Sequence, residues 1–308
     1  MTGQAGDRAT AAGAGAAGSI YDLGYQHYAG PRLGRRAAFA ALYADSLRAC
    51  FGLSRPGRAK IVPIGLLAIA LVPAIIAVAV DALLAGVGSG VVRNPIRYET
   101  YFGATFQIVV LFVAAQAPEL LGRDQRHQVL ALYFSRALKR RDYALAKLAA
   151  LVSALLILLV VPQGVIFAGK ILGGSDIAAA FGDNLGKVPA ILLSSGAAAF
   201  VLASIGLAVA SFTPRRAYAT AGIFAFFYIS IAVGAIGHEA ANGDLARYIL
   251  LVAPTNALDG LTAWLFGTQP GDLLAEAAIA GQVYAGATVV MAAVAIAVLL
   301  RRYARIPA

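Results

Sequence analysis

Charged side chains are scarce in this sequence, and the largest group of them lies in one short segment. Seven lysines and arginines fall between Arg123 and Lys147, although only 13% of the 308 residues are charged. An apolar run long enough to cross a bilayer lies on each side of the segment. A basic segment in that position is typical of a loop on the cytoplasmic side of a membrane, where a partner can reach it.

No arrangement typical of an enzyme, a nucleotide site or a metal site stands out. Residues Gly13 to Gly18 spell GxGxxG, but no strand precedes them and no βαβ unit follows, as a dinucleotide site requires. Residues Gly182 to Lys187 imitate a phosphate-binding loop with three residues between the glycines instead of four, and Val188 replaces the hydroxyl residue. One cysteine and three scattered histidines give no metal-ligand spacing. The sequence predicts no catalytic, cofactor or metal site in this chain.

The composition is that of an integral membrane protein. Hydrophobic residues make up 60% of the chain and the mean hydropathy is +0.77, which no ordinary soluble domain shows. The net charge of +10 would suggest a nucleic-acid partner for a soluble protein. Here the basic residues cluster in short loops beside the apolar runs, so the positive-inside rule accounts for them and no nucleic acid is expected.

Six apolar runs have the length that a helix needs to cross a hydrocarbon core of about 30 Å. We therefore predict an all-α fold in which residues 61–308 form a six-span transmembrane domain. Pro63 and Pro73 are candidate kinks in the first span. The predicted spans cover residues 61–82, 101–121, 145–168, 188–211, 217–237 and 276–300.

The residues before the first span divide into two parts. Residues 1–18 are rich in alanine and glycine and have few large apolar side chains to bury. This composition predicts a disordered tail. Residues 19–60 predict a cytoplasmic segment, in which apolar residues recur every three or four positions from Leu33 to Phe51. This pattern predicts an amphipathic helix along the membrane surface, with packing on a soluble partner as the alternative.

The distribution of charge predicts the orientation. With the amino terminus inside, 20 of the 25 lysines and arginines lie in cytoplasmic segments, so both termini are expected in the cytoplasm. The protein is expected in the plasma membrane, the inner membrane of a bacterium. The outer loop 238–275 is partly apolar, and Pro254 and Gly260 break it into pieces too short to cross. It predicts a hairpin resting at or dipping into the outer interface, with a plain loop as the alternative.

Ionisable residues are nearly absent from the spans, whereas ion-driven pumps usually need them there. The polar residues in the spans are neutral, and such residues most often form hydrogen bonds between helices. Some of them are candidates for a substrate pathway. These are Gln107, Gln116, Gln163, Tyr228 and Gln282.

A six-span protein without ion-coupling residues or a nucleotide site must, if it pumps, take its energy from another chain. The charged segment resembles the first cytoplasmic loop of ABC-2 type transporter permeases, the membrane subunits of type V-like ATP-binding-cassette exporters. In that family an acidic residue near the end of the second span precedes a Ser-Arg pair, a tyrosine and a lysine that enters the third span. This sequence supplies Glu119, Asp124, Ser135-Arg136, Tyr143 and Lys147 in that order.

The resemblance covers roughly residues 20–305. Residues 33–51 resemble the family's elbow helix, and residues 238–275 resemble its outer re-entrant element. The stretch from Gly24 to Arg32 is similar to the GYxxYxGxR pattern of actinobacterial members. Ala137 stands where the family usually has proline, so the loop forms either a broken helix, as in the family, or one longer helix.

The resemblance implies roles for two groups of residues. The loop that would receive force from a partner ATPase contains Glu119, Arg123, Asp124, Arg126, Tyr133, Ser135, Arg136, Tyr143 and Lys147. The elbow and docking residues are Tyr25, Tyr28, Arg32, Arg35, Arg36 and Arg48.

We therefore expect the permease subunit of an ABC exporter, in which two copies form the pathway and a separate cytoplasmic ATPase subunit binds ATP and Mg. The alternatives are a stand-alone channel or secondary carrier, and a membrane scaffold that transports nothing. Family members move drugs, lipids, polysaccharides and peptides, and neutral polar side chains do not choose among these substrates.

Overall fold

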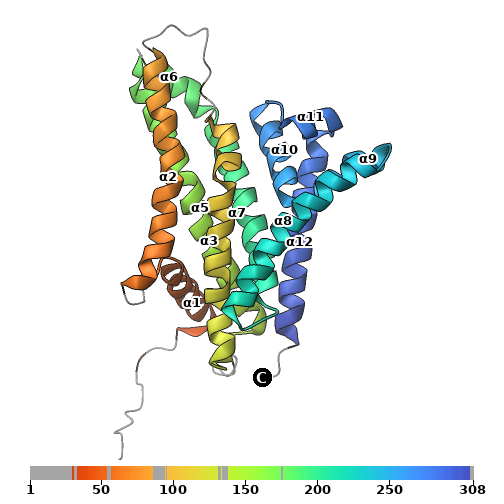
Figure 1. The fold of residues 1–308 in the computed structure, drawn as a ribbon. Helices are drawn as coiled ribbons and strands as arrows, with labels where there is room; N and C mark the ends of the chain where they lie inside the picture. The colour runs from red at the N-terminus through yellow and green to blue at the C-terminus, as the bar shows by residue number, and fades with distance from the viewer. Residues whose placement is uncertain are drawn as a thin grey trace, which may run out of the picture. The chain divides into compact units, whose positions relative to one another are not determined.

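Six long helices form a bundle and run from one end of it to the other (Figure 1). The computed structural model describes residues 30, 33–53, 57–85, 94, 96–130, 133, 138–174 and 176–305. Within these ranges every regular element is a helix, and all but residues 30 and 33 belong to one unit, Gly34–Ala308. The predicted disordered tail, residues 1–18, lies outside the described residues. So do Tyr25, Tyr28, Arg32, Ser135, Arg136 and Ala137.

The six helices are long and apolar enough to cross a membrane, which confirms the predicted all-helical fold with six candidate spans. Four of them extend beyond the predicted bounds at both ends and α12 extends beyond its predicted carboxyl end, because these helices continue through turns that the apolar runs leave out. In chain order the six are α2 (Arg58–Ala85), α3 (Tyr98–Arg126), α5 (Arg140–Leu172), α7 (Val188–Ala210), α8 (Arg216–Ala240) and α12 (Gly281–Ala304).

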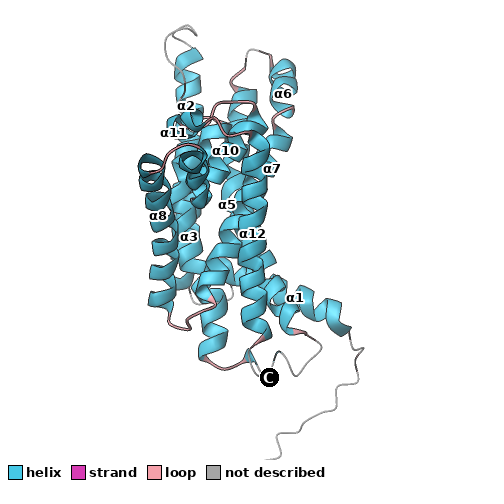
Figure 2. Cartoon of the chain, turned by 90° about the vertical axis from the view of Figure 1, so that its right-hand side faces the viewer, coloured by secondary structure: helices cyan, strands magenta, loops and turns pink. Residues whose placement is uncertain are grey.

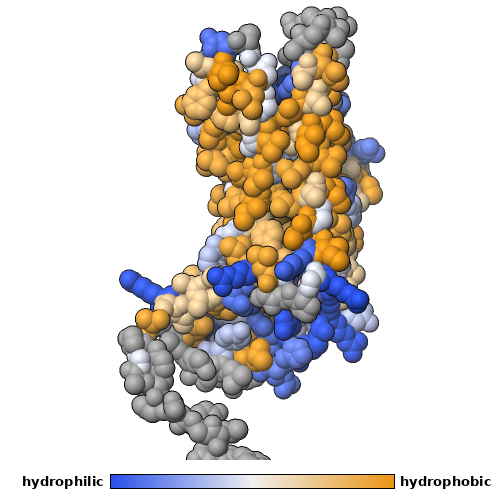
Figure 3. Space-filling view, turned by 90° about the vertical axis from the view of Figure 1, so that its left-hand side faces the viewer, coloured by the Kyte–Doolittle hydropathy of each residue, from blue (hydrophilic) through white to orange (hydrophobic). Residues whose placement is uncertain are grey.

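The six helices divide into an inner and an outer set. Most of α3, α5 and α7 is buried among the other helices, whereas most residues of α2, α8 and α12 are partly or fully exposed. On the face that includes α2, Figure 3 shows a broad hydrophobic band above a cluster of hydrophilic side chains. A band of this kind is stable in hydrocarbon and would be an aggregation site in water. The fold is that of a multi-pass membrane protein.

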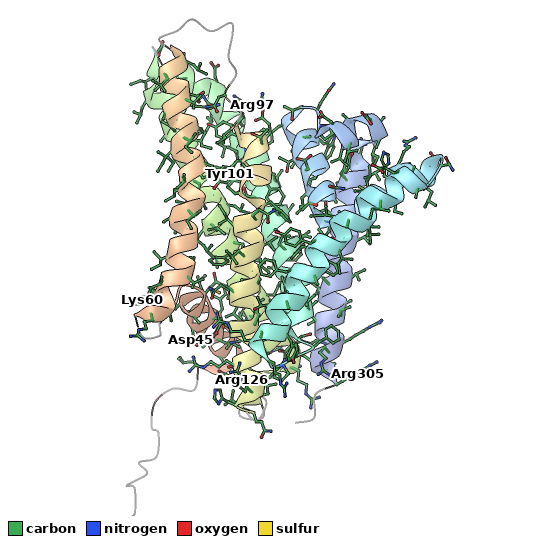
Figure 4. The ribbon with its side chains drawn as sticks, in the orientation of Figure 1. Asp45, Lys60, Arg97, Tyr101, Arg126 and Arg305 are labelled. Carbon is green, nitrogen blue, oxygen red and sulfur yellow. The ribbon has the colours of Figure 1, made fainter. Side chains whose placement is uncertain are left out.

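The two ends of the bundle differ in charge. Asp45, Lys60, Arg126 and Arg305 all lie at one end, whereas Arg97 lies at the other (Figure 4). We call the first the charged end, which consists of residues 34–60, 119–147, 211–216 and 300–305 where they are described. We call the opposite one the far end, which consists of residues 82–100, 170–190 and 238–281 where they are described.

Helix α1 (Gly34–Cys50) lies at the charged end, as the two views in Figures 1 and 2 agree. Its buried residues Leu42, Ser46 and Cys50 are four positions apart and therefore form one face, which packs on α5. The hydroxyl groups of Tyr43 and Ser153 are 2.9 Å apart and hydrogen-bond the two helices together. A helix therefore occupies the predicted segment, and its position along a membrane surface stays a prediction.

The segment between α8 and α12 folds back at the far end. Short helices α9 (Asp244–Tyr248) and η1 (Ile249–Val252) lead into α10 (Pro254–Phe266), and the chain bends by 102° at the break between them. Pro254 is the first residue of α10, where its missing N–H group costs no hydrogen bond. The two pieces together are apolar enough to form one broken span or a re-entrant loop, and their depth in the membrane stays a prediction.

Two details of this region correct the sequence-based predictions. Gly260 does not break the segment but lies within α10, where a Cβ atom would overlap the ring of Tyr284 on α12. The glycine therefore allows a close approach of two helices. The sixth span begins at Gly281 and not at residue 276, because Asp272–Ala277 forms a separate helix, α11, and Ala278 adopts a left-handed conformation with φ of 48°.

A second close approach, between α3 and α7, generates a prediction of stability. A Cβ atom on Gly206 would overlap Val113, so Gly206→Ala should lower the free energy of unfolding by about 1–3 kcal/mol. Gly196→Ala on the same helix is the matched control, because a Cβ atom there meets nothing within 4 Å. Thermal unfolding in detergent measures both variants, and Val113→Ala should restore the Gly206 variant. Equal stability of the two single variants would contradict this packing.

Candidate functional site

The charged segment is divided between two helices and is not a free loop. Helix α3 continues to Arg126, so Glu119 and Asp124 lie on its last two turns. Helix α5 begins at Arg140, so Tyr143 and Lys147 lie on its first two turns. The Asp142 carboxylate at the start of α5 accepts a hydrogen bond of 3.0 Å from the backbone N–H of Lys139, a local interaction that favours a helix start there.

The alternative of one longer helix through the segment is excluded by two interruptions. Gln128 has φ of 54°, a left-handed conformation that ends α3, and the Val129 N–H closes this end by donating to the carbonyl of Asp124. Lys139 is extended, with φ of −80° and ψ of 155°, so α5 starts as a new helix. We call residues 123–139 the tip of the charged segment. Helix α3 ends within the tip, and α5 starts directly after it.

Asp124 is the centre of the site. The ammonium of Lys147 lies 3.0 Å from Oδ2 of Asp124, and the Tyr143 hydroxyl donates to the same oxygen over 2.7 Å. Only 14% of the Asp124 side chain and 7% of the Lys147 side chain are exposed. Burying two charges is costly, and the cost is offset when they pair and the carboxylate accepts a further hydrogen bond. The pair therefore fixes α3 against α5.

The hydrogen bonds continue from Tyr143 to the end of α12. The rings of Tyr143 and Tyr303 are 5.3 Å apart, and the Tyr303 hydroxyl accepts a hydrogen bond of 3.1 Å from the Gln125 amide. Gln125 and Arg302 both donate to the carbonyl of Ser211, which caps the end of α7. The ends of α3, α5, α7 and α12 are thus joined by Asp124, Gln125, Tyr143, Lys147, Ser211, Tyr303 and, at the exposed edge, Arg302. We call these seven residues the buried network.

Two further ion pairs bind neighbouring helices to the same end. Arg35 of α1 makes two parallel contacts with the Asp142 carboxylate, at 2.5 and 2.6 Å. This contact raises the pKa of Arg35 further above its usual value, so the guanidinium stays charged. Arg216 of α8 lies 2.6 Å from Glu119 of α3. Both arginines are about half exposed, so the pairs orient helices more than they stabilise the fold.

Tyr133 is the one described residue between the turn at 127–130 and Leu138. Its ring lies 5.6 Å from that of Tyr143. Burial raises its pKa, and the carboxylates of Asp124 and Asp45 raise it further, so its hydroxyl stays neutral at physiological pH. Tyr133 therefore adds an aromatic contact to the buried network.

The five candidates for a substrate pathway are not brought together. Gln163 is buried, donates a hydrogen bond of 3.0 Å to Ser195, and lines a small cavity between α3, α5, α7 and α10. Gln107 and Tyr228 are exposed and hydrogen-bond to each other between α3 and α8. Gln116 is buried within α3, and Gln282 is exposed at the start of α12.

Comparison with known proteins now identifies the class of molecule. Residues 123–306 match the family described as ABC-2 family transporter protein, which is more than half of the chain. The chain belongs to the ABC-2 family. It is therefore a membrane subunit of a transporter. Comparison with curated proteins gives no match. The matched region of this ABC-2 protein begins at the charged tip and includes α5, α7, α8 and α12.

The residues that the resemblance implies for coupling form two groups in this ABC-2 protein. Asp124, Tyr143 and Lys147 are held inside the buried network and do not form its surface. Arg123 and Arg126 are exposed at the tip. On α1, Arg35, Arg36 and Arg48 are exposed as well, and Arg35 holds Asp142.

Sequence reasoning missed Gln125, Ser211, Arg302 and Tyr303. Their partners lie far away along the chain, 178 residues apart in the case of Gln125 and Tyr303. The one available signal was a tyrosine among the arginines at the end of the sixth span, a position where the apolar pattern has stopped.

The buried pair can be tested by a double-mutant cycle. Asp124→Asn or Lys147→Met alone leaves one buried charge unpaired and should cost about 3–5 kcal/mol of stability. The double variant should cost less than the sum, because Asn at 124 still accepts from Tyr143 and no buried charge remains. Asp244→Asn is the control, since Asp244 is 81% exposed and its pair with Arg247 should contribute under about 1 kcal/mol. Additive losses at Asp124 and Lys147 would contradict the pairing.

Proposed function

We propose that this chain is the permease subunit of an ABC exporter, driven by a separate ATPase subunit that docks on the charged end from the cytoplasm. The observation that supports this most is the buried network, which connects an exposed basic tip to the ends of four spanning helices. A transporter without a nucleotide site of its own needs such a connection between a partner and its spans. ATP and Mg bind in the partner.

The exposed residues of the charged end suit docking. Arg123, Arg126 and His127 project from the end of α3, and Arg36 and Arg48 project from α1. Arginine forks bind carboxylates with two parallel hydrogen bonds, so an acidic groove on the partner is the complementary surface. Helix α1 has the role of the elbow, lying along the cytoplasmic membrane surface and held to α5 by the Arg35–Asp142 pair.

The buried network suits transmission. A force on the tip acts on α3 and α5 together, because Asp124, Tyr143 and Lys147 hold the two helix ends in one arrangement. Tyr303 and Arg302 pass the same movement to α12, and Glu119 passes it to α8 through Arg216. Interfaces packed in this way move as rigid bodies rather than deforming gradually. ATP-driven closure of the partner would thus rock whole helices between inward and outward states.

A second copy of the chain completes the pathway in this proposal. The hydrogen-bonded pair of Gln107 and Tyr228 is exposed within the hydrophobic band on α3 and α8. Polar groups at that depth are costly against lipid and are usual against another helix or a water-filled path. The face of α3 and α8 is therefore the surface that would meet the second copy and line the path. Both termini and the charged end are cytoplasmic, and the hairpin α9–α10 re-enters the membrane from outside.

Docking can be tested on the protein purified from its own membranes. A tagged chain should retain an ATPase subunit, identifiable by mass spectrometry, and Arg123→Glu/Arg126→Glu should lose most of it, because reversed charge repels an acidic groove. Arg247→Glu is the matched control, a partly exposed arginine of the far end whose replacement should leave ATPase retention at the wild-type level. Flux through the isolated chain, with no ATPase retained by the wild type, would contradict this function and favour a channel or carrier.

A further inference from the structure

The short helix α6 (Ile177–Leu185), which connects α5 to α7 at the far end, carries an unusual exposed stripe. Ile177, Phe181 and Leu185 are 58%, 47% and 50% exposed and are four residues apart, so they form one face. The stripe continues onto α5, where Leu172 is 74% exposed. Side chains of this kind form an apolar surface beside the hydrophobic band.

The neighbouring edge of α6 is fixed to the bundle, so the stripe is held in place. Asn184 is buried and accepts a hydrogen bond of 3.2 Å from the Tyr98 hydroxyl. The rings of Phe181 and Phe167 are 6.1 Å apart, and the Asp176 carboxylate caps the start of the helix. Ala179 and Asp183 point away from the stripe and are exposed. The helix thus has an anchored edge, an apolar face and a polar face.

Two lysines flank this anchored edge. The ammonium of Lys170 lies 4.9 Å and that of Lys187 lies 5.9 Å from the centre of the Tyr98 ring. Within the described residues, neither ammonium forms an ion pair. Two cations that share one aromatic ring and lack a carboxylate partner repel each other, and an anion between them would remove that cost.

The other charged groups near the lysines leave a positive site. Asp81, Glu99 and Arg97 are the remaining charges whose fields reach Lys170. Glu99 and Arg97 neutralise each other in a pair of 3.1 Å. Asp81 accepts a hydrogen bond of 2.8 Å from the Asn94 amide and opposes one of the two lysines. Of the groups whose fields reach Lys170, Asp81 is thus the carboxylate without a cationic partner, and it faces the ammonium groups of two lysines.

We propose that Lys170 and Lys187 bind the headgroup phosphate of an anionic phospholipid at the far-end membrane surface, with the α6 stripe lying against its acyl chains. Helix α6 joins the ends of two spans, which is the level where headgroups lie. The positive charge of the two lysines selects an anionic headgroup. The apolar stripe selects a lipid over free phosphate, because only a lipid has acyl chains to lie against it. A nine-residue helix is about 13 Å long, too small a face to hold a second copy of the chain by itself.

The headgroup can be tested by native mass spectrometry of the protein in mixed micelles with phosphatidylglycerol and phosphatidylcholine of identical chains. The wild type should retain phosphatidylglycerol preferentially, and Lys170→Gln/Lys187→Gln should reduce the preference roughly fivefold for each lysine removed. Asp81→Asn should increase the preference. Arg247→Gln is the matched control and should leave the lipid preference unchanged. Arg247 is also a cation of the far end, but it lies on α9 over the ring of Tyr248 and not beside Tyr98. An unchanged preference in the double lysine variant would overturn the site.

The stripe can be tested by fluorescence in bilayers that contain lipid brominated near the headgroup end of the acyl chain. The chain has a single tryptophan, Trp264, so a Trp264→Phe background with Phe181→Trp reports on the stripe alone. Bromolipid should quench the Phe181→Trp protein strongly and should quench an Ala179→Trp protein, with its tryptophan on the polar face, weakly. Equal quenching of the two variants would overturn the proposal. So would a disulfide between two copies that carry Phe181→Cys, since a second copy would then cover the stripe.

Discussion

The ion pair between Asp124 and Lys147 is the interaction on which the charged end depends. Two charges with little exposure are stable there only in contact with each other, so their positions set the distance between α3 and α5. Tyr143, Tyr303 and Gln125 then complete the hydrogen bonds, and each can do so in one arrangement of the helix ends. In the proposed function, a partner that pushes on the end of α3 therefore meets several helices that are already joined.

The two ends of the molecule meet the membrane in different ways. The charged end carries most of the arginines and lysines, and in the proposed function its exposed arginines are the surface on which the ATPase docks. The far end has few cations, and two of them lie near the ring of Tyr98 beside α6, which carries an exposed apolar stripe. Between the ends, α3 and α7 approach closely at Gly206 while α2, α8 and α12 face outward. One end is thus suited to force transfer and the other to anchoring in the bilayer.

The sequence predicts the number of spans because length and hydropathy report directly on the membrane. It predicts the ends of the helices less well, because contacts such as Arg35–Asp142 stabilise turns that hydropathy cannot recognise. The sequence predicts a break at Gly260 because glycine occurs both at breaks and at close contacts, and the ring of Tyr284 shows that this glycine serves a close contact. Gln107 and Gln163 look alike in apolar runs, yet one is exposed and the other is buried. An almost uniformly apolar helix carries no signal of which face points inward, so the pathway and the buried network depend on tertiary structure.

In the proposed function, the buried network transmits the movement of the ATPase to the spans. The most direct test is the distance between spin labels on Ile236→Cys of two copies, in a Cys50→Ser background, within the reconstituted complex with its ATPase. ATP should shift this distance in the otherwise wild-type protein. Tyr143→Phe, which removes the hydroxyl that donates to Asp124, should abolish the shift while ATP is still hydrolysed. The same ATP-dependent shift in both proteins would contradict transmission through the network.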